Sequence, residues 1–237
     1  MIVYGRNPVR EALRGRREVR RIWATKHAAR EPWLAALAGS SLGPTIEPAP
    51  AIEALCGSPS HQGVCAEVSS FGYLSGDDLL SADEPLIVAF DQVQDPQNLG
   101  SICRVAECAG ATGLVLPERR SAMVTAAVSK ASAGAVEHVA LARVRNLVDF
   151  LAEAKAASLW CYGAEAQASV SYEKVDFRGG VVLVFGSEGR GLRPRVAAAC
   201  DLLLRIPLHG KVSSLSVASA AAVLLYAVSG QRSVDAK

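Results

Sequence analysis

Two loops of small and polar residues follow apolar runs near the end of the chain, and one arginine lies within an apolar helical segment. The loop 186–191, GSEGRG, follows the run Val181–Phe185, and the loop 207–214 follows Leu202–Ile206. Short apolar runs that stop at glycine or proline are typical of buried parallel strands, and α/β proteins bind ligands at the carboxyl ends of such strands. Arg104 needs an anion or a ligand as its partner in apolar surroundings. These features indicate a ligand pocket beside a site that binds negative charge.

The elements that would position these residues alternate between strand and helix. Apolar runs and helical runs follow one another from Glu84 onward, which predicts a parallel sheet covered on both faces. The expected strands are 86–90, 112–116, 138–142, 159–163, 181–185 and 202–206, and the expected helices are 97–109, 124–131, 147–156, 194–199 and 216–229. Residues 1–70 form a smaller α/β pattern, in which Arg6–Arg14 is an expected helix followed by Gly15. The polar stretch 71–83 is interpreted as a linker. The predicted domains are therefore 1–70 and 84–237.

Charge is distributed unevenly along the chain. The net charge is +2, yet residues 1–30 contain nine lysines and arginines against two glutamates, an excess of seven. Such asymmetry indicates a polyanionic partner bound by the amino-terminal end. A solvated helix face is the alternative interpretation.

Other residue types exclude several classes of site. The six cysteines form no CxxC pair and are predicted to be buried, reduced thiols, and the four histidines have no metal-binding spacing. No metal site is expected. No apolar run reaches the roughly 18 residues of a membrane span, and the first residues lack the pattern of a signal peptide. We therefore expect a cytoplasmic protein without a membrane partner.

Three segments together resemble the motifs of a known family. They are residues 91–116 (DQVQDPQNLGSICRVAECAGATGLVL), 184–194 (VFGSEGRGLRP) and 206–226 (IPLHGKVSSLSVASAAAVLLY). In this order they resemble the SpoU family of RNA ribose 2′-O-methyltransferases. The stretches YGRNPVREAL and HQGVCAEV resemble the RNA-binding module of the family's 23S rRNA guanosine-2′-O-methyltransferases. A dinucleotide-binding fold is rejected, because GSEGRG reverses the GxGxxG order and lies far along the chain.

The resemblance implies a fold, a cofactor and a set of site residues. The fold is a parallel α/β sheet with a carboxyl-terminal deep trefoil knot, preceded by a small α/β RNA-binding domain. The cofactor is S-adenosyl-L-methionine, and the residues implied to contact it are Gly186, Ile206, Leu208 and Leu215. The residues implied to surround the point of methyl transfer are Asn98, Arg104, Glu188 and Ser214.

Alternatives to these roles remain open at this point. The glycines of the second motif also fit ordinary turn chemistry, and Ile206 and Leu215 also fit core packing. Arg104 also fits an internal ion pair with Glu107 or Glu188.

The resemblance implies transfer of a methyl group from S-adenosyl-L-methionine to a ribose 2′-hydroxyl, expected to be that of a guanosine in 23S rRNA. A tRNA substrate and a non-catalytic RNA-binding relative are the alternatives. The second alternative depends on Ser216, which stands where the third motif usually has asparagine. We also expect a homodimer formed through the knotted domain, with the alanine-rich last helix as a plausible contact. Packing of that helix within its own subunit is the other interpretation.

Overall fold

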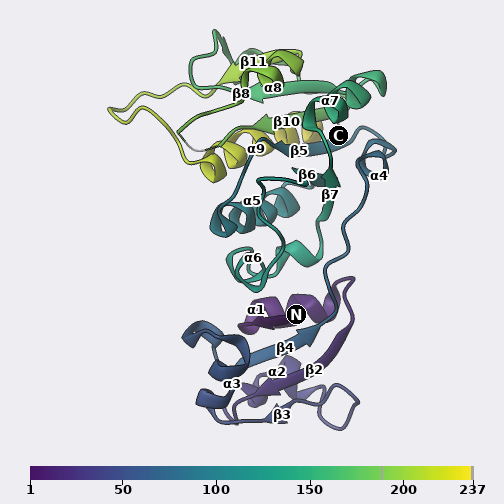
Figure 1. Cartoon of the computed structure of the whole chain (residues 1–237), viewed down its shortest axis with the longest axis vertical. Helices are drawn as coiled ribbons and strands as arrows, with labels where there is room; N and C mark the ends of the chain where they lie inside the picture. The colour runs from purple at the N-terminus through teal and green to yellow at the C-terminus, as the bar shows by residue number, and fades with distance from the viewer. Residues whose placement is uncertain (188, 236–237) are drawn as a thin grey trace. The chain divides into compact units, whose positions relative to one another are not determined.

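The computed structural model describes residues 1–187 and 189–235, which form two compact units (Figure 1). The first unit consists of residues 1–72 and 123–138, and the second consists of residues 73–122 and those after 138. The segment 123–138 thus packs with the first unit, although it lies within the range of the predicted domain 84–237. The chain therefore passes between the units three times. The division into domains 1–70 and 84–237 stays a prediction.

The first unit contains a four-stranded sheet with the order β1-β4-β2-β3. Its elements are β1 (Ile2–Tyr4), α1 (Arg6–Arg14), β2 (Val19–Ala24), α2 (Pro32–Ala35), β3 (Thr45–Ile46), α3 (Ala49–Cys56), β4 (Val64–Val68) and α6 (Ala126–Ala131). Helix α1 has the predicted bounds and lies between Gly5 and Gly15. It buries Val9 and Ala12 against Ile22 of β2, so one face of the sheet and the helix form the core of this unit.

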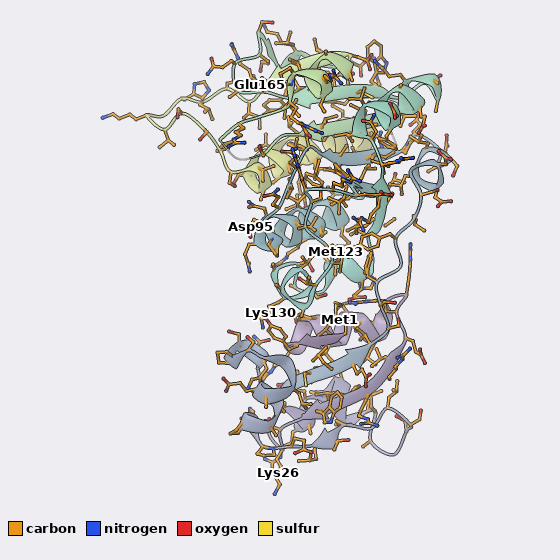
Figure 2. The ribbon with its side chains drawn as sticks, viewed as in Figure 1. Met1, Lys26, Asp95, Met123, Lys130 and Glu165 are labelled. Atoms are coloured by element: carbon orange, nitrogen blue, oxygen red, sulfur yellow. The ribbon has the colours of Figure 1, made fainter. Side chains whose placement is uncertain are left out.

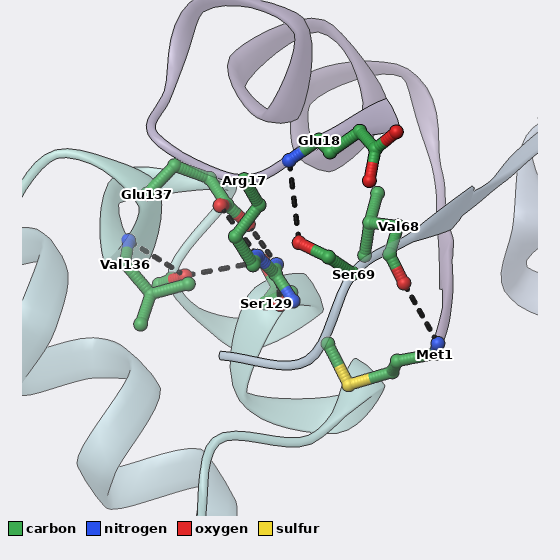
Figure 3. A network of polar contacts seen from close by, with 9 residues as sticks. Met1, Arg17, Glu18, Val68, Ser69, Ser129, Val136 and Glu137 are labelled. Atoms are coloured by element: carbon green, nitrogen blue, oxygen red, sulfur yellow. Dashed lines mark hydrogen bonds and ion pairs between the residues drawn. The ribbon is translucent and has the colours of Figure 1, made fainter. Parts of the chain in front are cut away.

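A buried ion pair holds the segment 123–138 to the amino-terminal residues (Figure 3). The Arg17 guanidinium pairs with Glu137, and the Arg17 Nε donates to Glu137 Oε2 at 2.8 Å. The two side chains are 5% and 0% exposed. His138 adds a second contact, because its Nε2 lies 2.9 Å from Glu11 Oε2. Charged groups from distant parts of the sequence therefore meet inside this unit.

The second unit is built on a seven-stranded sheet with the order β7-β6-β5-β10-β8-β11-β9. Its strands are β5 (Leu86–Phe90), β6 (Gly113–Pro117), β7 (Ala140–Val144), β8 (Trp160–Ala164), β9 (Val170–Ser171), β10 (Val181–Phe185) and β11 (Leu202–Arg205). Its helices are α4 (Gly76–Leu80), α5 (Pro96–Cys108), α7 (Leu147–Ala156), α8 (Pro194–Ala199) and α9 (Val217–Asp235). Every pair of neighbouring strands is parallel, which confirms the predicted sheet. The trefoil knot stays a prediction.

Helices cover both faces of this sheet (Figure 1). Val182 and Val184 of β10 belong to the apolar core that α7 and α8 complete. The alternate residue Phe185 points to the opposite face, because side chains alternate along a strand. Helix α9 packs on β10 and on α5. The central strands are therefore fully buried, which explains their continuous apolar sequences.

The last helix is longer than predicted. The predicted helix stops at Gly230, but α9 continues to Asp235. Beyond the glycine, Gln231 accepts a hydrogen bond from the Phe177 N–H at 2.8 Å and donates to the Val175 carbonyl at 3.0 Å. These tertiary contacts offset the roughly 1 kcal/mol by which glycine disfavours a helix interior. Strand β7 also differs from its predicted bounds, because it spans Ala140–Val144 rather than residues 138–142.

Candidate functional site

A pocket lies at the carboxyl ends of three neighbouring strands. β10, β8 and β11 are adjacent and parallel, so the segments that follow them emerge at one edge of the sheet. The wall of a pocket of about 350 Å³ is formed mostly by residues 164–167, 185–187 and 189–191, together with Ile206, Leu208, Ser214, Leu215 and Val217. Figure 2 labels Glu165 at the end of β8. Position and volume both match those of small-molecule sites in α/β proteins.

The glycine-rich loop after β10 folds tightly back on itself. The Ser187 N–H donates to the Gly191 carbonyl at 3.1 Å, and the Gly191 N–H donates to the Ser187 carbonyl at 3.0 Å. A Cβ at Gly186 would lie 2.1 Å from the carbonyl carbon of Gly191, so a side chain cannot be accommodated there. Turn geometry thus requires glycine at 186, and the same geometry brings backbone to the pocket surface. Glu188, which was predicted to act in this loop, lies outside the described residues.

A buried carboxylate anchors the far end of this loop. Asp91 follows β5, and its side chain is completely buried. It accepts hydrogen bonds from the Arg193 backbone N–H at 2.8 Å and from the Arg193 Nε at 2.6 Å. Asp91 therefore fixes the start of α8 relative to the sheet, and with it the loop 186–191.

Apolar side chains line the remainder of the pocket. Ile206, Leu208 and Leu215 all contribute to the wall, together with Gly186 and Ser214. All four residues predicted to contact a cofactor are thus brought together, with one of the four predicted catalytic residues. Leu208 and Leu215 are 40% and 42% exposed, so core packing does not account for them. Their role in binding stays a prediction.

Ser216 has a structural role at the start of α9 that the motif does not indicate. Its Oγ accepts a hydrogen bond from the Ser219 N–H at 3.1 Å, at the beginning of α9. Serine and asparagine are about equally good at capping the amino-terminal end of a helix. The replacement of the usual asparagine by serine therefore preserves this contact.

Asn98 and Arg104 lie on α5 and not in the wall of the pocket. Asn98 is half-buried in the first turn, and Arg104 is exposed. Within the part of the chain that the structure describes, no ion pair joins Arg104 to Glu107, one of the alternatives left open. Helix α5 packs against α9, whose residues Val217 and Ala220 reach the pocket. The other alternative, a pair of Arg104 with Glu188, stays open because residue 188 lies outside the described part of the chain.

The sequence motifs missed the residues that follow β8. Glu165 and Gln167 line the pocket, yet they belong to none of the three motifs. Their relevance depends on β8 being inserted between β10 and β11 in the sheet, and this order is not visible in the sequence. The one available signal was their place directly after a predicted strand.

The basic residues of the first unit divide into paired and unpaired groups. Several are engaged by carboxylates: Arg6 by Glu31, Arg10 and Arg14 by Glu11, Arg17 by Glu137 and Arg20 by Glu18. Four others are exposed and form no ion pair with any described residue: Arg16, Arg21, Lys26 and Arg30. The Arg21 guanidinium lies 5.6 Å from the centre of the Trp23 ring. These four residues are the best placed to bind phosphates.

All six cysteines are free thiols. Burial raises the pKa of Cys65, Cys103 and Cys161 to about 12. Cys108 is exposed, so the prediction of buried thiols is wrong at that position because the residue lies on the outer face of α5. Among residues 1–187 and 189–235, no three potential ligands gather into a metal site. In the same residues, no helix combines the length and apolar character of a membrane span.

Comparison with known proteins connects both units to one family. Residues 85–226 match the model of the SpoU rRNA methylase family, and residues 2–74 match the model of an RNA 2′-O ribose methyltransferase substrate-binding domain. YacO of Bacillus subtilis, which is named for the TrmH family of tRNA/rRNA methyltransferases, is 36% identical over 97% of this chain and 95% of its own length.

Solved structures give the same result. The SpoU methyltransferase AviRb from Streptomyces viridochromogenes, in complex with the cofactor AdoMet, superposes with a TM-score of 0.83 at 26% identity, covering 98% of this chain and 90% of its own. The AdoMet-bound rRNA methyltransferase from Sinorhizobium meliloti has a TM-score of 0.78 at 27% identity, covering 96% and 85%. The resemblance found in the three motifs is confirmed: the chain belongs to the SpoU rRNA methylase family.

Proposed function

We propose that this protein transfers a methyl group from S-adenosyl-L-methionine to the ribose 2′-hydroxyl of a guanosine in 23S rRNA. The observation that carries the proposal is the pocket beyond β8, β10 and β11, because its wall unites the four residues that the motifs indicated for the cofactor. The general activity, methylation of rRNA or tRNA with S-adenosylmethionine as the donor, follows from membership of the family.

The pocket has the chemistry that an adenosyl compound requires. The backbone of the loop 186–191 offers N–H and C=O groups for the edge of an adenine, because the glycines remove intervening side chains. Ile206, Leu208 and Leu215 provide apolar surface for its faces. When bound, S-adenosyl-L-methionine supplies an electrophilic methyl group on its sulfonium.

The residues proposed for catalysis would prepare the ribose oxygen for attack. A ribose hydroxyl is a poor nucleophile until its proton is removed or shared, and in-line transfer depends on positioning. We assign Arg104 to bind an RNA phosphate and to stabilise the developing alkoxide, since arginine hardly loses its proton in proteins. Ser214, in the pocket wall, would orient the donor, and Asn98 and Glu188 would hold the guanidinium or the substrate.

The amino-terminal unit supports rRNA over tRNA as the substrate. Residues 2–74 match a substrate-binding model, and the two solved relatives described above align over nearly the whole chain, one of them an rRNA methyltransferase. A tRNA substrate remains the second candidate, because YacO is named for both RNA classes. Serine and asparagine cap a helix about equally well, so the presence of Ser216 does not by itself favour a non-catalytic relative.

We assign RNA affinity to the exposed basic residues of the first unit. Arg16, Arg21, Lys26 and Arg30 would neutralise phosphates, so binding should weaken as salt increases. Deletion of residues 1–70 is a poor test, because the segment 123–138 packs with these residues and would lose both its packing and the Arg17–Glu137 pair. Replacement of all four basic residues by glutamine should weaken RNA binding strongly and leave cofactor binding unchanged. Unchanged RNA binding would refute this assignment.

A homodimer formed through the second unit completes the proposal. Val212 in the loop before α9 is 75% exposed, and Tyr226 on α9 is 56% exposed. A second copy of the chain would cover such apolar surface. The buried face of α9, with Ala221, Leu224 and Val228, already packs within its own subunit, so the outer face would form the contact. Sedimentation of wild type and of Tyr226→Glu distinguishes a dimer from a monomer.

The experiment that tests the function directly is methyl transfer in vitro. Purified protein is incubated with labelled S-adenosyl-L-methionine and with 23S rRNA or total tRNA, and ribose methylation is located by resistance to alkaline hydrolysis. We expect label in 23S rRNA at a guanosine, and a steep loss of turnover in Arg104→Ala with cofactor binding retained. Label confined to tRNA would support the second candidate, and label on a base would contradict the ribose assignment.

A further inference from the structure

The backbone of Glu165 is held by two hydrogen bonds at the carboxyl ends of the strands that form the pocket. Its N–H donates to the Leu204 carbonyl at 2.9 Å, and its own carbonyl accepts from the Ala168 N–H at 3.1 Å. The residue thus continues the pairing of β8 with β11 beyond the end of β8, and Figure 2 labels it there. A side chain that begins at a fixed Cα can hold a ligand in a defined orientation.

The Glu165 carboxylate occupies the space beside Gly191. A Cβ at residue 191 would lie 3.0 Å from Glu165 Oε2, and Gly191 has a φ of +66°. Glycine at this position therefore allows the left-handed turn and also leaves room for the carboxylate. Gly191 of the second motif and Glu165 after β8 therefore pack directly against each other.

The Glu165 side chain lines the pocket, and the described residues offer its carboxylate no partner. Among residues 1–187 and 189–235, no ion pair and no side-chain hydrogen bond engages it, although the residue is half-buried. An ionised carboxylate is an acceptor with capacity for several hydrogen bonds. Glu165 is therefore suited to a ligand that presents donors.

We propose that Glu165 accepts hydrogen bonds from the two ribose hydroxyls of the bound adenosyl ligand. The inference rests on the proposed function, which makes the ligand an adenosyl compound. Ile206 and Leu215 offer apolar surface for the base, and the ribose is attached directly to that base. A neighbouring pair of hydroxyls presents two donors to one carboxylate, as at the ribose of dinucleotide-binding sites.

The ligand's charged end fits another part of the pocket. Pairing an ammonium group with a half-buried carboxylate would require both charges to lose water, which opposes the gain in attraction. Arg190 also lines the pocket and is exposed, so the amino-acid end of the ligand can stay hydrated near it. Neutral hydroxyls are thus the better partners for Glu165.

The test is calorimetric titration with two product-like compounds. S-adenosylhomocysteine contains adenosine and an amino-acid end, whereas 5′-methylthioadenosine contains the adenosine alone. Glu165→Gln keeps the size of the side chain and removes its charge, so we expect both compounds to bind about tenfold more weakly. Glu153→Gln, at an exposed position on α7, is the matched control and should bind both as wild type does.

A third ligand makes the test independent of any change in folding. The 2′,3′-dideoxy form of 5′-methylthioadenosine should bind wild type about tenfold more weakly than the parent compound, and should bind Glu165→Gln with the same affinity as wild type. A loss restricted to S-adenosylhomocysteine would overturn the proposal in favour of the ammonium group. Equal binding of all compounds to variant and wild type would also overturn it. Failure of wild type to bind either parent compound would instead refute the proposed function.

Discussion

In the first unit, Arg17 and Glu137 pair with almost no exposure to solvent, whereas in the second unit the buried Asp91 pairs with an arginine, Arg193, that is 50% exposed. The first pair joins residues 120 positions apart and secures the segment 123–138. The second pair secures a loop of the pocket. In a fully buried pair each partner depends on the other for solvation, whereas a half-exposed arginine can return to water. The two pairs should therefore respond differently to mutation.

The largest effect is expected from Arg17→Ala. Removal of the guanidinium leaves the buried Glu137 without its partner, which should lower the free energy of unfolding by about 3–5 kcal/mol. Urea denaturation measures the change, with the exposed neighbour Arg16→Ala as control. Arg17→Met combined with Glu137→Leu should recover much of the loss. Stability within about 0.5 kcal/mol of wild type in Arg17→Ala would show that the pair does not hold the first unit together.

Asp91→Asn should have a smaller effect on stability and a clear effect on the pocket. Asparagine can still accept the Arg193 backbone N–H, and the half-exposed guanidinium regains water, so the expected cost is about 1–3 kcal/mol. Because the anchor of the loop 186–191 is weakened, binding of S-adenosylhomocysteine should weaken as well. Asp176→Asn, in an exposed pair with Arg178, is the control and should leave binding unchanged. Weaker folding with unaltered binding would limit Asp91 to a structural role.

Substitutions at Ser216 separate capping from catalysis. Ser216→Ala removes the acceptor for the Ser219 N–H and should cost about 1 kcal/mol, whereas Ser216→Asn should retain wild-type stability. Thermal unfolding of the two variants measures the difference. If Ser216→Asn raised methyl transfer markedly at unchanged stability, the residue would have a role beyond its cap.

The smallest effect concerns the reactivity of thiols in the two units. Cys65 in the first unit and Cys103 and Cys161 in the second have a pKa raised to about 12 by burial, so they should be protected alike. Cys108 is exposed on α5 and should react first with iodoacetamide in the native protein. Mass spectrometry after brief labelling identifies the modified residue. Early modification of Cys65 would indicate that the core of the first unit opens more readily than that of the second.

The sequence predicted elements better than it predicted their assembly. Val181–Phe185 and Arg6–Arg14 have the predicted bounds, because a buried strand and a short helix flanked by glycines are local patterns. The continuation of α9 past Gly230 depends on contacts of Gln231 with residues distant in the sequence. The attachment of 123–138 to the first unit likewise depends on Glu137 meeting Arg17.

In the candidate site, too, local motifs were predicted and contacts between distant segments were not. The motifs indicated Gly186, Ile206, Leu208 and Leu215, and the structure places all four in one pocket. Glu165 was missed because its place beside Gly191 results from the order of the strands. The order of the strands in the sheet cannot be predicted from composition or from hydrophobic periodicity.

The central claim is that the pocket beyond β8, β10 and β11 binds the methyl donor, and calorimetric titration of S-adenosyl-L-methionine tests it most directly. Leu215→Glu is the informative variant, because residue 215 is exposed in the wall of the pocket and its replacement should leave folding intact. We predict saturable binding to one site per chain in wild type and its loss in Leu215→Glu at an unchanged melting temperature. Absence of binding in wild type, or equal affinity in the variant, would contradict the account.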